Sequence, residues 1–255
     1  MKKVFYLCFM VSAAFAWAGP DDELLKQVDG LASYMDADFS AVYEIVQQRP
    51  GQDNTVTRAG LYRRDIKEQY VIIIIEPAVS RGQGYLKEGN TIWFYDPESM
   101  SFNSTSSRER FQNSNASNAD FTRSTLSIDY RPVSASNEML GKFKCRVLNL
   151  QAVSKNVVYP KTKIWVSEDG LVRKTEDYSL SGQLLRTTEI PSYYKIGTRY
   201  VPKAIRIIDA LRGARVNGIF QNETTIISIT NPSFDKVDNI VFSKAYLENI
   251  NRRKS

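Results

Sequence analysis

The chain has 255 residues, of which 42% are hydrophobic and 24% are charged, and this composition is that of a soluble globular protein with a core of its own. Its formal net charge of +6 comes from Lys and Arg scattered along the whole length, and no basic cluster interleaved with aromatic residues indicates a nucleic-acid-binding surface. The chain has no histidine, which excludes every His-containing catalytic triad and removes the commonest general base and metal ligand.

The first residues have the pattern of a secretory signal. A basic start precedes an apolar run, which ends in the cleavage-type sequence Ala16-Trp17-Ala18. The apolar run is too short to span a bilayer. We therefore expect residues 1–18 to be removed and residues 19–255 to form a single exported domain.

Cysteine usage in the exported part indicates that burial, and not cross-linking, supports the fold. Cys8 lies within the signal, so only Cys145 remains after cleavage. A single cysteine forms no internal disulfide and no thiolate cluster for zinc. Phe143, Cys145 and Val147 alternate with basic residues, so we interpret Cys145 as a small buried core residue and not as a nucleophile.

One amphipathic helix is expected at residues 21–35, followed by a long series of strands. Leu24, Leu25, Val28 and Leu31 recur at helical spacing, and the acidic residues before them suit a helix N-terminus. Beyond this segment the apolar period changes to two. We predict strands at 38–48, 55–66, 69–76, 91–95, 142–153, 160–167, 171–178, 184–190, 201–209 and 219–230, with a further strand near 127–132.

Short turns between these strands predict one large antiparallel sheet. Asp169-Gly170, between two alternating segments, is among the strongest short-range hairpin signals. A sheet of this size must curl or close, because flat open sheets of many strands are unusual. The segment VIIIIEP at 71–77 is apolar on both faces and needs cover on two sides, and its alternation leaves open which face points inward.

The segment IWFYDP at 92–97 places four large apolar side chains together before a strand-ending proline. Exposed apolar strand surface invites aggregation, so a core, a partner or a lipid must cover these side chains. Trp93 and Tyr95 share a strand face. They fit either a packed core or the wall of a ligand cavity.

Residues 97–126 interrupt the strand pattern. Eight Ser and four Asn in thirty positions favour caps and turns. Phe102, Phe111 and Phe121 are regularly spaced among them. This spacing favours a lid-like insertion that packs back on the sheet, in preference to a flexible loop. The sequence Asn118-Ala119-Asp120-Phe121 is suited to start a short helix.

Motifs for catalysis and for phosphate binding are absent from the sequence. The segment Gly82-Gln83-Gly84 lacks the Lys-Ser pair of a phosphate-binding loop, and no serine lies in a G-x-S-x-G elbow. Neighbouring carboxylates such as Glu176 and Asp177 point to opposite faces of a strand, and we interpret them as surface charges. We expect a protein that is not an enzyme, without catalytic residues, metal or cofactor.

Two segments, GLYRRDIKEQYVIIIIEP at 60–77 and GYLKEGNTIWFYDP at 84–97, resemble the LolA/LolB-like outer-membrane lipoprotein-sorting proteins of the Gram-negative periplasm. Members of this family carry an arginine at a strand end, then an apolar strand, then a Gly-x-x-x-Trp-x-Tyr-Asp/Asn-Pro run. The segments SNADF, YPKTKIWV and YSLSGQLLRT strengthen the resemblance, which spans about residues 21–250.

The resemblance implies a mainly β fold, a half-open antiparallel β-barrel whose mouth is closed by a helical lid and which encloses an apolar cavity. Arg64 matches the arginine that latches the lid to the barrel in the family's lipoprotein carriers. Asp65 stands where those carriers often have proline, and it can pair with Arg64 in competition with the latch. The sequence has no lipid-modification motif, and in this respect it resembles the family's soluble carrier more than its anchored acceptor.

The function implied is that of a periplasmic carrier for the acyl chains of lipoproteins or phospholipids. Its partners would be an inner-membrane donor complex and an outer-membrane acceptor, and we expect a monomer. Two alternatives stay open, a lipid hydrolase that uses the same cavity and an envelope docking module without a ligand. The residues expected to contact lipid are Ile73, Ile75, Trp93, Tyr95, Phe111 and Phe121.

Overall fold

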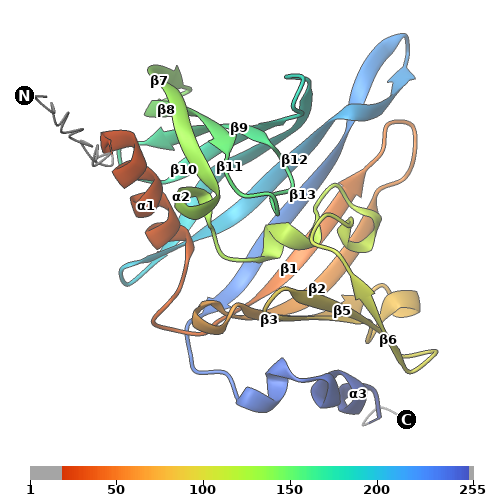
Figure 1. The fold of residues 1–255 in the computed structure, drawn as a ribbon. Coiled ribbons are helices and arrows are strands. Elements are labelled where there is room, and N and C mark those ends of the chain that lie inside the picture. Colours follow the sequence, from red (N-terminus) through yellow and green to blue (C-terminus); the bar gives the residue numbers. More distant parts are fainter. Residues whose placement is uncertain (1–18, 253–255) are drawn as a thin grey trace, which may run out of the picture.

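A computed structural model describes residues 19–252, so the expected signal at 1–18 lies outside the described residues. Thirteen strands form one antiparallel sheet in the order β6-β5-β4-β3-β2-β1-β13-β12-β11-β10-β9-β8-β7 (Figure 1). The strands are β1 (Phe39–Gln48), β2 (Thr55–Arg64), β3 (Gln69–Glu76), β4 (Gly84–Glu88), β5 (Thr91–Asp96), β6 (Ser101–Thr105), β7 (Tyr130–Leu140), β8 (Phe143–Ala152), β9 (Lys161–Ser167), β10 (Val172–Tyr178), β11 (Leu184–Ile196), β12 (Arg199–Val216) and β13 (Ile219–Ser233).

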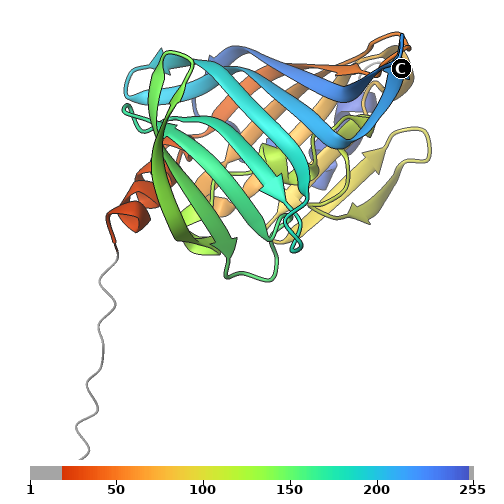
Figure 2. The same cartoon turned by 90° about the horizontal axis from the view of Figure 1, so that it is seen from above.

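The sheet curls into a half-open barrel. Strands β6 and β7 form its two ends, and the described pairings do not join them. Seen from above, the strands wrap around a central space with one side left open (Figure 2). This curvature follows from the twist of adjacent strands, which accumulates over so many of them. The predicted fold class, a half-open antiparallel barrel, is confirmed.

Helix α1 (Pro20–Ala32) covers the β7–β9 end of the sheet. Its Leu25 and Val28 are fully buried and pack with Leu148, Leu150 and Ile164. A short helix α2 (Leu126–Asp129) lies beside α1, and α3 (Lys244–Arg252) lies near the C-terminus (Figure 1). Within residues 19–252, none of the helices has the length and apolarity that crossing a membrane requires.

Strand β3 is covered on both faces, as its apolar sequence predicts. Tyr70, Ile72 and Ile74 point into the barrel and are buried in the main core. Val71 and Ile73 point outward and pack against the C-terminal segment. The structure thus resolves the facing of this strand, which alternation alone could not decide.

The outer cover is supplied by residues 237–247, which run beneath β2–β5 and end in α3 (Figure 1). Leu247 is fully buried against this outer face. A Cβ placed on Gly84 would lie only 2.5 Å from Cδ2 of Leu247, so the helix touches the backbone of β4 directly. The outer apolar face is therefore part of the protein's own core.

Several elements differ from the sequence prediction. Strands β4 and β6 and helix α3 were not predicted, and the strand expected near 127–132 begins only at Tyr130, after α2. Strands β11, β12 and β13 extend well beyond the predicted 184–190, 201–209 and 219–230. In β12 the extension follows a register irregularity between Ile208 and Gly213, which interrupts the alternation that reveals a strand.

Replacement of Leu247 with alanine tests the outer cover. We expect Leu247→Ala to lower the free energy of unfolding by about 2–5 kcal/mol, because it empties a fully buried site. Denaturant unfolding followed by circular dichroism measures this. Val79→Ala, at a side chain that is 88% exposed, should change it by less than about 0.5 kcal/mol. Equal effects of the two variants would contradict the assignment of α3 to the core.

Candidate functional site

A cavity of about 570 Å³ lies between α1, the insertion and the inner face of the sheet. This volume is within the range of small-molecule and cofactor sites, roughly 300–1,000 Å³. The apolar part of its wall comes from α1 and from strands on both sides of the sheet. These residues include Val28, Leu31, Phe39, Tyr43, Tyr70, Ile164, Ile190, Val201, Ile205 and Ile229.

The segment 106–125 of the insertion crosses the inside of the barrel and fills part of it (Figure 1). Phe111 and Phe121 are buried in the main core, with their ring centroids 4.6 Å apart. Phe111 also lies 4.8 Å from the ring of Tyr85, and Phe121 lies 5.9 Å from the ring of Tyr43. Phe111 and Phe121 thus form part of the packed core, and neither belongs to the lining of the cavity.

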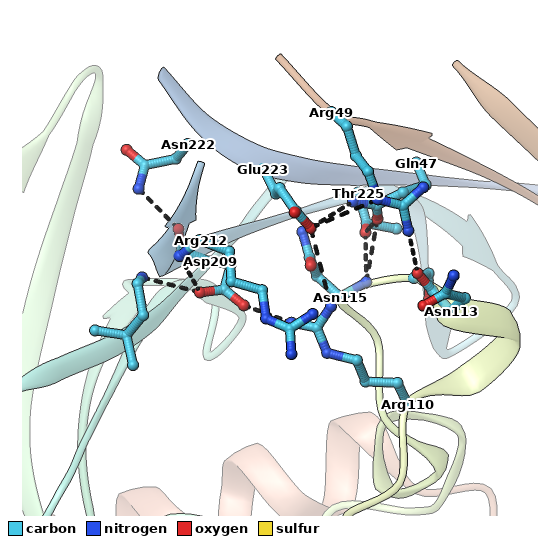
Figure 3. A network of polar contacts seen from close by, with 12 residues as sticks. Gln47, Arg49, Arg110, Asn113, Asn115, Asp209, Arg212, Asn222, Glu223 and Thr225 are labelled. Atoms are coloured by element: carbon cyan, nitrogen blue, oxygen red, sulfur yellow. Dashed lines mark hydrogen bonds and ion pairs between the residues drawn. The ribbon is translucent and has the colours of Figure 1, made fainter. Parts of the chain in front are cut away.

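Polar contacts at one end of the barrel hold this segment to β1, β12 and β13 (Figure 3). Arg110 forms an ion pair with Asp209 at 2.6 Å. Arg49 donates a hydrogen bond to the carbonyl oxygen of Asn113 at 2.8 Å. The backbone N–H of Asn115 lies 2.8 Å from Oγ1 of the fully buried Thr225 on β13 and 3.2 Å from Oε1 of Gln47 on β1. The segment is therefore bound to three strands that are distant from it in sequence.

An ion triad, in which Asp177 is buried and Asp120 lies at the surface, joins the segment to the opposite half of the sheet. Arg186 on β11 contacts Asp120 at 2.8 Å and Asp177 on β10 at 3.0 Å, and its guanidinium lies 4.8 Å from the ring centroid of Tyr159. Burial acts to lower the pKa of Arg186, but the two carboxylates raise it well above its ordinary value. Burial raises the pKa of Asp177. The sequence interpretation of Asp177 as a surface charge is wrong, because its side chain points into the barrel.

A third group of contacts lies at the mouth of the cavity, where Arg123 of the insertion forms an ion pair with Glu68 at 2.7 Å. The hydrogen bond from Arg123 lowers the pKa of Glu68. Lys87 donates to the carbonyl oxygens of Glu68 and Gly89, and burial lowers its pKa. The mouth is thus polar, in contrast to the apolar wall behind it.

Arg63 at the end of β2 connects α1, the insertion and the sheet. Its guanidinium forms an ion pair with Asp65 at 2.7 Å. It donates to the carbonyl oxygen of Ala32 in α1 at 3.2 Å and to that of Thr122 in the insertion at 3.4 Å. Asp65 in turn accepts the backbone N–H of Tyr34 at 2.7 Å. Arg63 therefore makes the contacts that the resemblance implied for a lid latch.

Arg64 points to the other face of the sheet, so the predicted latch position needs correction. Its guanidinium pairs with Asp38 at 2.7 Å and donates to Asn239 at 2.6 Å and to the carbonyl oxygen of Val237 at 2.7 Å. It also stacks 4.4 Å from the ring centroid of Phe242. Consecutive strand residues face opposite ways, which separates Arg63 from Arg64. Arg64 fastens the C-terminal segment, and Asp65 pairs with Arg63 instead of competing for Arg64.

The residues expected to form a lipid-binding wall on β3 and β5 also face outward. Ile73, Trp93 and Tyr95 belong to the cluster beneath the C-terminal segment, and Nζ of Lys244 lies 3.5 Å from the ring centroid of Trp93. Ile75 follows Ile73 on the same strand face and is 37% exposed. The structure corrects their placement, because the protein's own C-terminal segment supplies the cover that this aromatic run requires.

Phe111 and Phe121 lie inside the barrel, where they pack against the core instead of lining the open space. Of the predicted site residues, these two are the ones brought together near the cavity. Sequence reasoning missed Arg63, Arg110 and Arg186, which hold the insertion. The one available signal was the Arg63-Arg64 pair at a strand end, where one of the two side chains must face the barrel.

Chemically, the site is an apolar chamber whose arginines face carboxylates. Among residues 19–252, no three or more acidic or cysteine side chains are grouped so as to hold a metal ion. The chamber offers burial to an apolar group, and the polar mouth offers charged and hydrogen-bonding contacts. A removable cover would be needed for a guest to enter.

Comparisons with known proteins agree with this architecture. A family model described as an uncharacterized protein matches residues 67–249. A LolA superfamily protein from Nitrosomonas europaea is 25% identical, with a TM-score of 0.73 over 88% of this chain and 97% of that one. The chain belongs to the LolA-like family.

Two further solved structures share the fold. A domain from Vibrio parahaemolyticus, named for outer membrane lipoprotein sorting, is 18% identical with a TM-score of 0.76. A DUF1329 family protein from Desulfovibrio piger is 19% identical with a TM-score of 0.77. Each alignment covers 89% of this chain and 97% of the neighbour. A comparison with curated proteins gives no match.

The Asp38–Arg64 pair predicts how stability depends on pH. Hydrogen bonds from Arg64 hold the pKa of Asp38 below its ordinary value. Such a group contributes stability that is fully present above its unfolded pKa of about 3.9 and is lost as the pH falls through the folded pKa. Asp38→Asn should therefore lower stability most at neutral pH, and its difference from the wild type should shrink below about pH 4. Urea unfolding from neutral pH to below about pH 4 measures the free energy of unfolding of both proteins. A difference between them that stays constant with pH would contradict the Asp38–Arg64 pairing.

Asp120→Asn tests whether the ion triad of Arg186, Asp120 and Asp177 holds the insertion. We expect amide exchange in residues 106–125 to accelerate, since the variant removes one of the two charges facing Arg186. Hydrogen exchange followed by mass spectrometry resolves this segment from the strands. Asp36→Asn is a matched control, because Asp36 pairs with Arg199 at 2.6 Å but is 76% exposed on its side chain. The triad would have no role in closure if both variants exchanged like the wild type.

Proposed function

We propose that this LolA-like protein holds the acyl chains of a lipoprotein or phospholipid in the barrel cavity and carries them through the cell envelope. The single observation that supports this most is the apolar chamber of about 570 Å³ beneath a segment that is fastened mainly by side-chain contacts. The proposed role is non-enzymatic and requires no cofactor.

The energetics of acyl chains explain why such a chamber is useful. Each buried methylene contributes about 0.8 kcal/mol, so one chain of ordinary length represents on the order of 10 kcal/mol of exposure to water. A cargo of this kind needs an apolar container to cross an aqueous space. The wall residues of α1, β1, β12 and β13 provide one.

Release requires that the container open again. Phe111 and Phe121 occupy the barrel interior, and the charged contacts of Arg63, Arg110 and Arg186 hold them there. Outward movement of segment 106–125 would enlarge the chamber and expose its wall. A ligand that binds the open form better shifts the equilibrium toward it, and its departure restores the closed form.

The proposed setting is the periplasm, with the protein acting as a monomer between an inner-membrane donor complex and an outer-membrane acceptor. The signal-type sequence at residues 1–18 and the lipoprotein-sorting name of the Vibrio neighbour support this setting. In this role the barrel binds the acyl chains, while the polar mouth faces the rest of the cargo.

A cavity-filling variant tests the proposed function. Ile205 on β12 lines the cavity, and Ile205→Trp should reduce co-purifying lipid by at least about tenfold, because the larger ring occupies the space of the guest. Native mass spectrometry after gentle purification measures lipid occupancy and identifies the lipid. Val133→Trp, at a side chain that is 66% exposed on β7, is the matched control and should retain lipid.

The outcomes separate the rival functions. Fatty acid and lysolipid products in the same spectra would indicate a hydrolase. Protein without lipid after incubation with lipoprotein or phospholipid would indicate a docking module. Equal lipid occupancy in Ile205→Trp and the wild type, with unchanged circular dichroism, would place the binding site outside this cavity.

A further inference from the structure

The hairpin formed by β12 and β13 projects beyond the sheet (Figure 1). Strand β11 pairs with β12 only as far as Arg186 and Asp209, and β1 pairs with β13 only from Gln48 and Thr224. Residues 210–223 therefore have no neighbouring strand in the described pairings and pair only with each other. We call residues 210–221 the hairpin tip.

The hairpin tip exposes large apolar side chains. Leu211 is 53% exposed, Ile219 is 68% exposed and Phe220 is 48% exposed. Natural proteins avoid exposed apolar strands with free edges, because such strands associate with other chains. A tip of this composition indicates a contact surface.

The charge of the hairpin tip is entirely positive. Arg212 and Arg215 are its only charged residues, and both are exposed. Arg215 lies opposite Phe220 in the strand register, which places a cation beside an exposed aromatic ring. Cations combined with exposed aromatic and aliphatic side chains are typical of segments that bind anionic membrane surfaces.

Hydrogen bonds fix the base of the hairpin, so the hairpin tip is held in an outward position and is not a flexible loop. Asp209 accepts the backbone N–H groups of Leu211 and Arg212, each at 2.9 Å, and Asn222 donates to its carbonyl oxygen at 2.8 Å (Figure 3). A Cβ on Gly213 would lie 2.1 Å from the carbonyl oxygen of Gln221, so only glycine fits there.

We propose that the hairpin tip docks on the surface of an anionic lipid bilayer. Its arginines face the headgroups, while Leu211, Ile219 and Phe220 enter the interfacial layer. The depth is limited by the backbone, because the unpaired N–H and C=O groups on both strand edges would lose water in the hydrocarbon core at a cost of several kcal/mol each. Docking is therefore shallow and reversible, and it does not depend on which cargo the cavity holds.

Vesicle co-sedimentation with the purified protein tests this. We expect binding to vesicles that contain phosphatidylglycerol and much weaker binding to pure phosphatidylcholine. The double variant Arg212→Ser/Arg215→Ser should bind the anionic vesicles roughly thirtyfold more weakly, as two arginines near an anionic surface contribute about 1 kcal/mol each. The variant Leu211→Ser/Phe220→Ser should also lose binding, since it removes the inserted side chains.

Matched controls separate the tip from general charge and apolarity. Lys142→Ser/Lys144→Ser removes two exposed cations from another hairpin, and Val79→Ser/Val133→Ser removes two side chains that are 88% and 66% exposed. Neither control pair should weaken vesicle binding by more than about fivefold, which on a logarithmic scale is half of the thirtyfold loss expected for the arginine variant. The proposal would be overturned by equal losses in tip and control variants, or by wild-type protein that binds neither vesicle.

A second measurement does not depend on removing side chains. The variant Phe220→Trp should retain anionic-vesicle binding, and difference spectra against Phe220→Tyr should show its tryptophan emission shifting to shorter wavelength when vesicles are added. An unshifted emission would overturn the proposal. So would dimerisation through the tip in analytical ultracentrifugation without vesicle binding, because the occupant would then be a second copy. Lipid occupancy of the cavity, measured separately, should be unchanged in all tip variants.

Discussion

The packing of segment 106–125 inside the curled sheet is the interaction on which the rest of the structure depends. An open sheet of thirteen strands has a concave apolar face too broad for α1 alone to cover. Phe111 and Phe121 cover much of the remainder. Because ion pairs, and not apolar burial alone, fix this segment at three places, the barrel can be closed around a chamber and still have a cover that is separable from its wall.

The two faces of the β2–β5 region have different neighbours. The outer face, with Trp93 and Arg64, is sealed by the C-terminal segment and contributes stability. The inner face, with Tyr70 and Arg63, borders the chamber and its cover. Adjacent residues of one strand thus make different contacts, and the outer packing and the chamber wall use different side chains of the same strands.

Much of the fold could be predicted from the sequence, since alternation, turn residues and the two-sided apolar strand at 71–77 together require a curled antiparallel sheet. The facing of β3 could not, because both of its faces are apolar and each has a cover that lies far away in the chain. Contacts such as Arg110 with Asp209 join residues 99 positions apart, and no local pattern encodes them. Helix α3 was missed because it is short and polar apart from the few side chains that reach the sheet. The aromatic run at 92–95 correctly indicated a need for cover but not whether a lipid or the chain itself supplies it.

The strand order has a consequence for how the molecule folds. Strand β1 pairs with β2 on one side and with β13 on the other, so the middle of the sheet joins the first strand to the last. Each half of the sheet can form from local hairpins. The pairing of β1 with β13, which joins the two halves, forms only once nearly the whole chain is present. Such long-range closure slows folding. A chain that completes its sheet so late stays incompletely folded until its last strand is available to pair with β1.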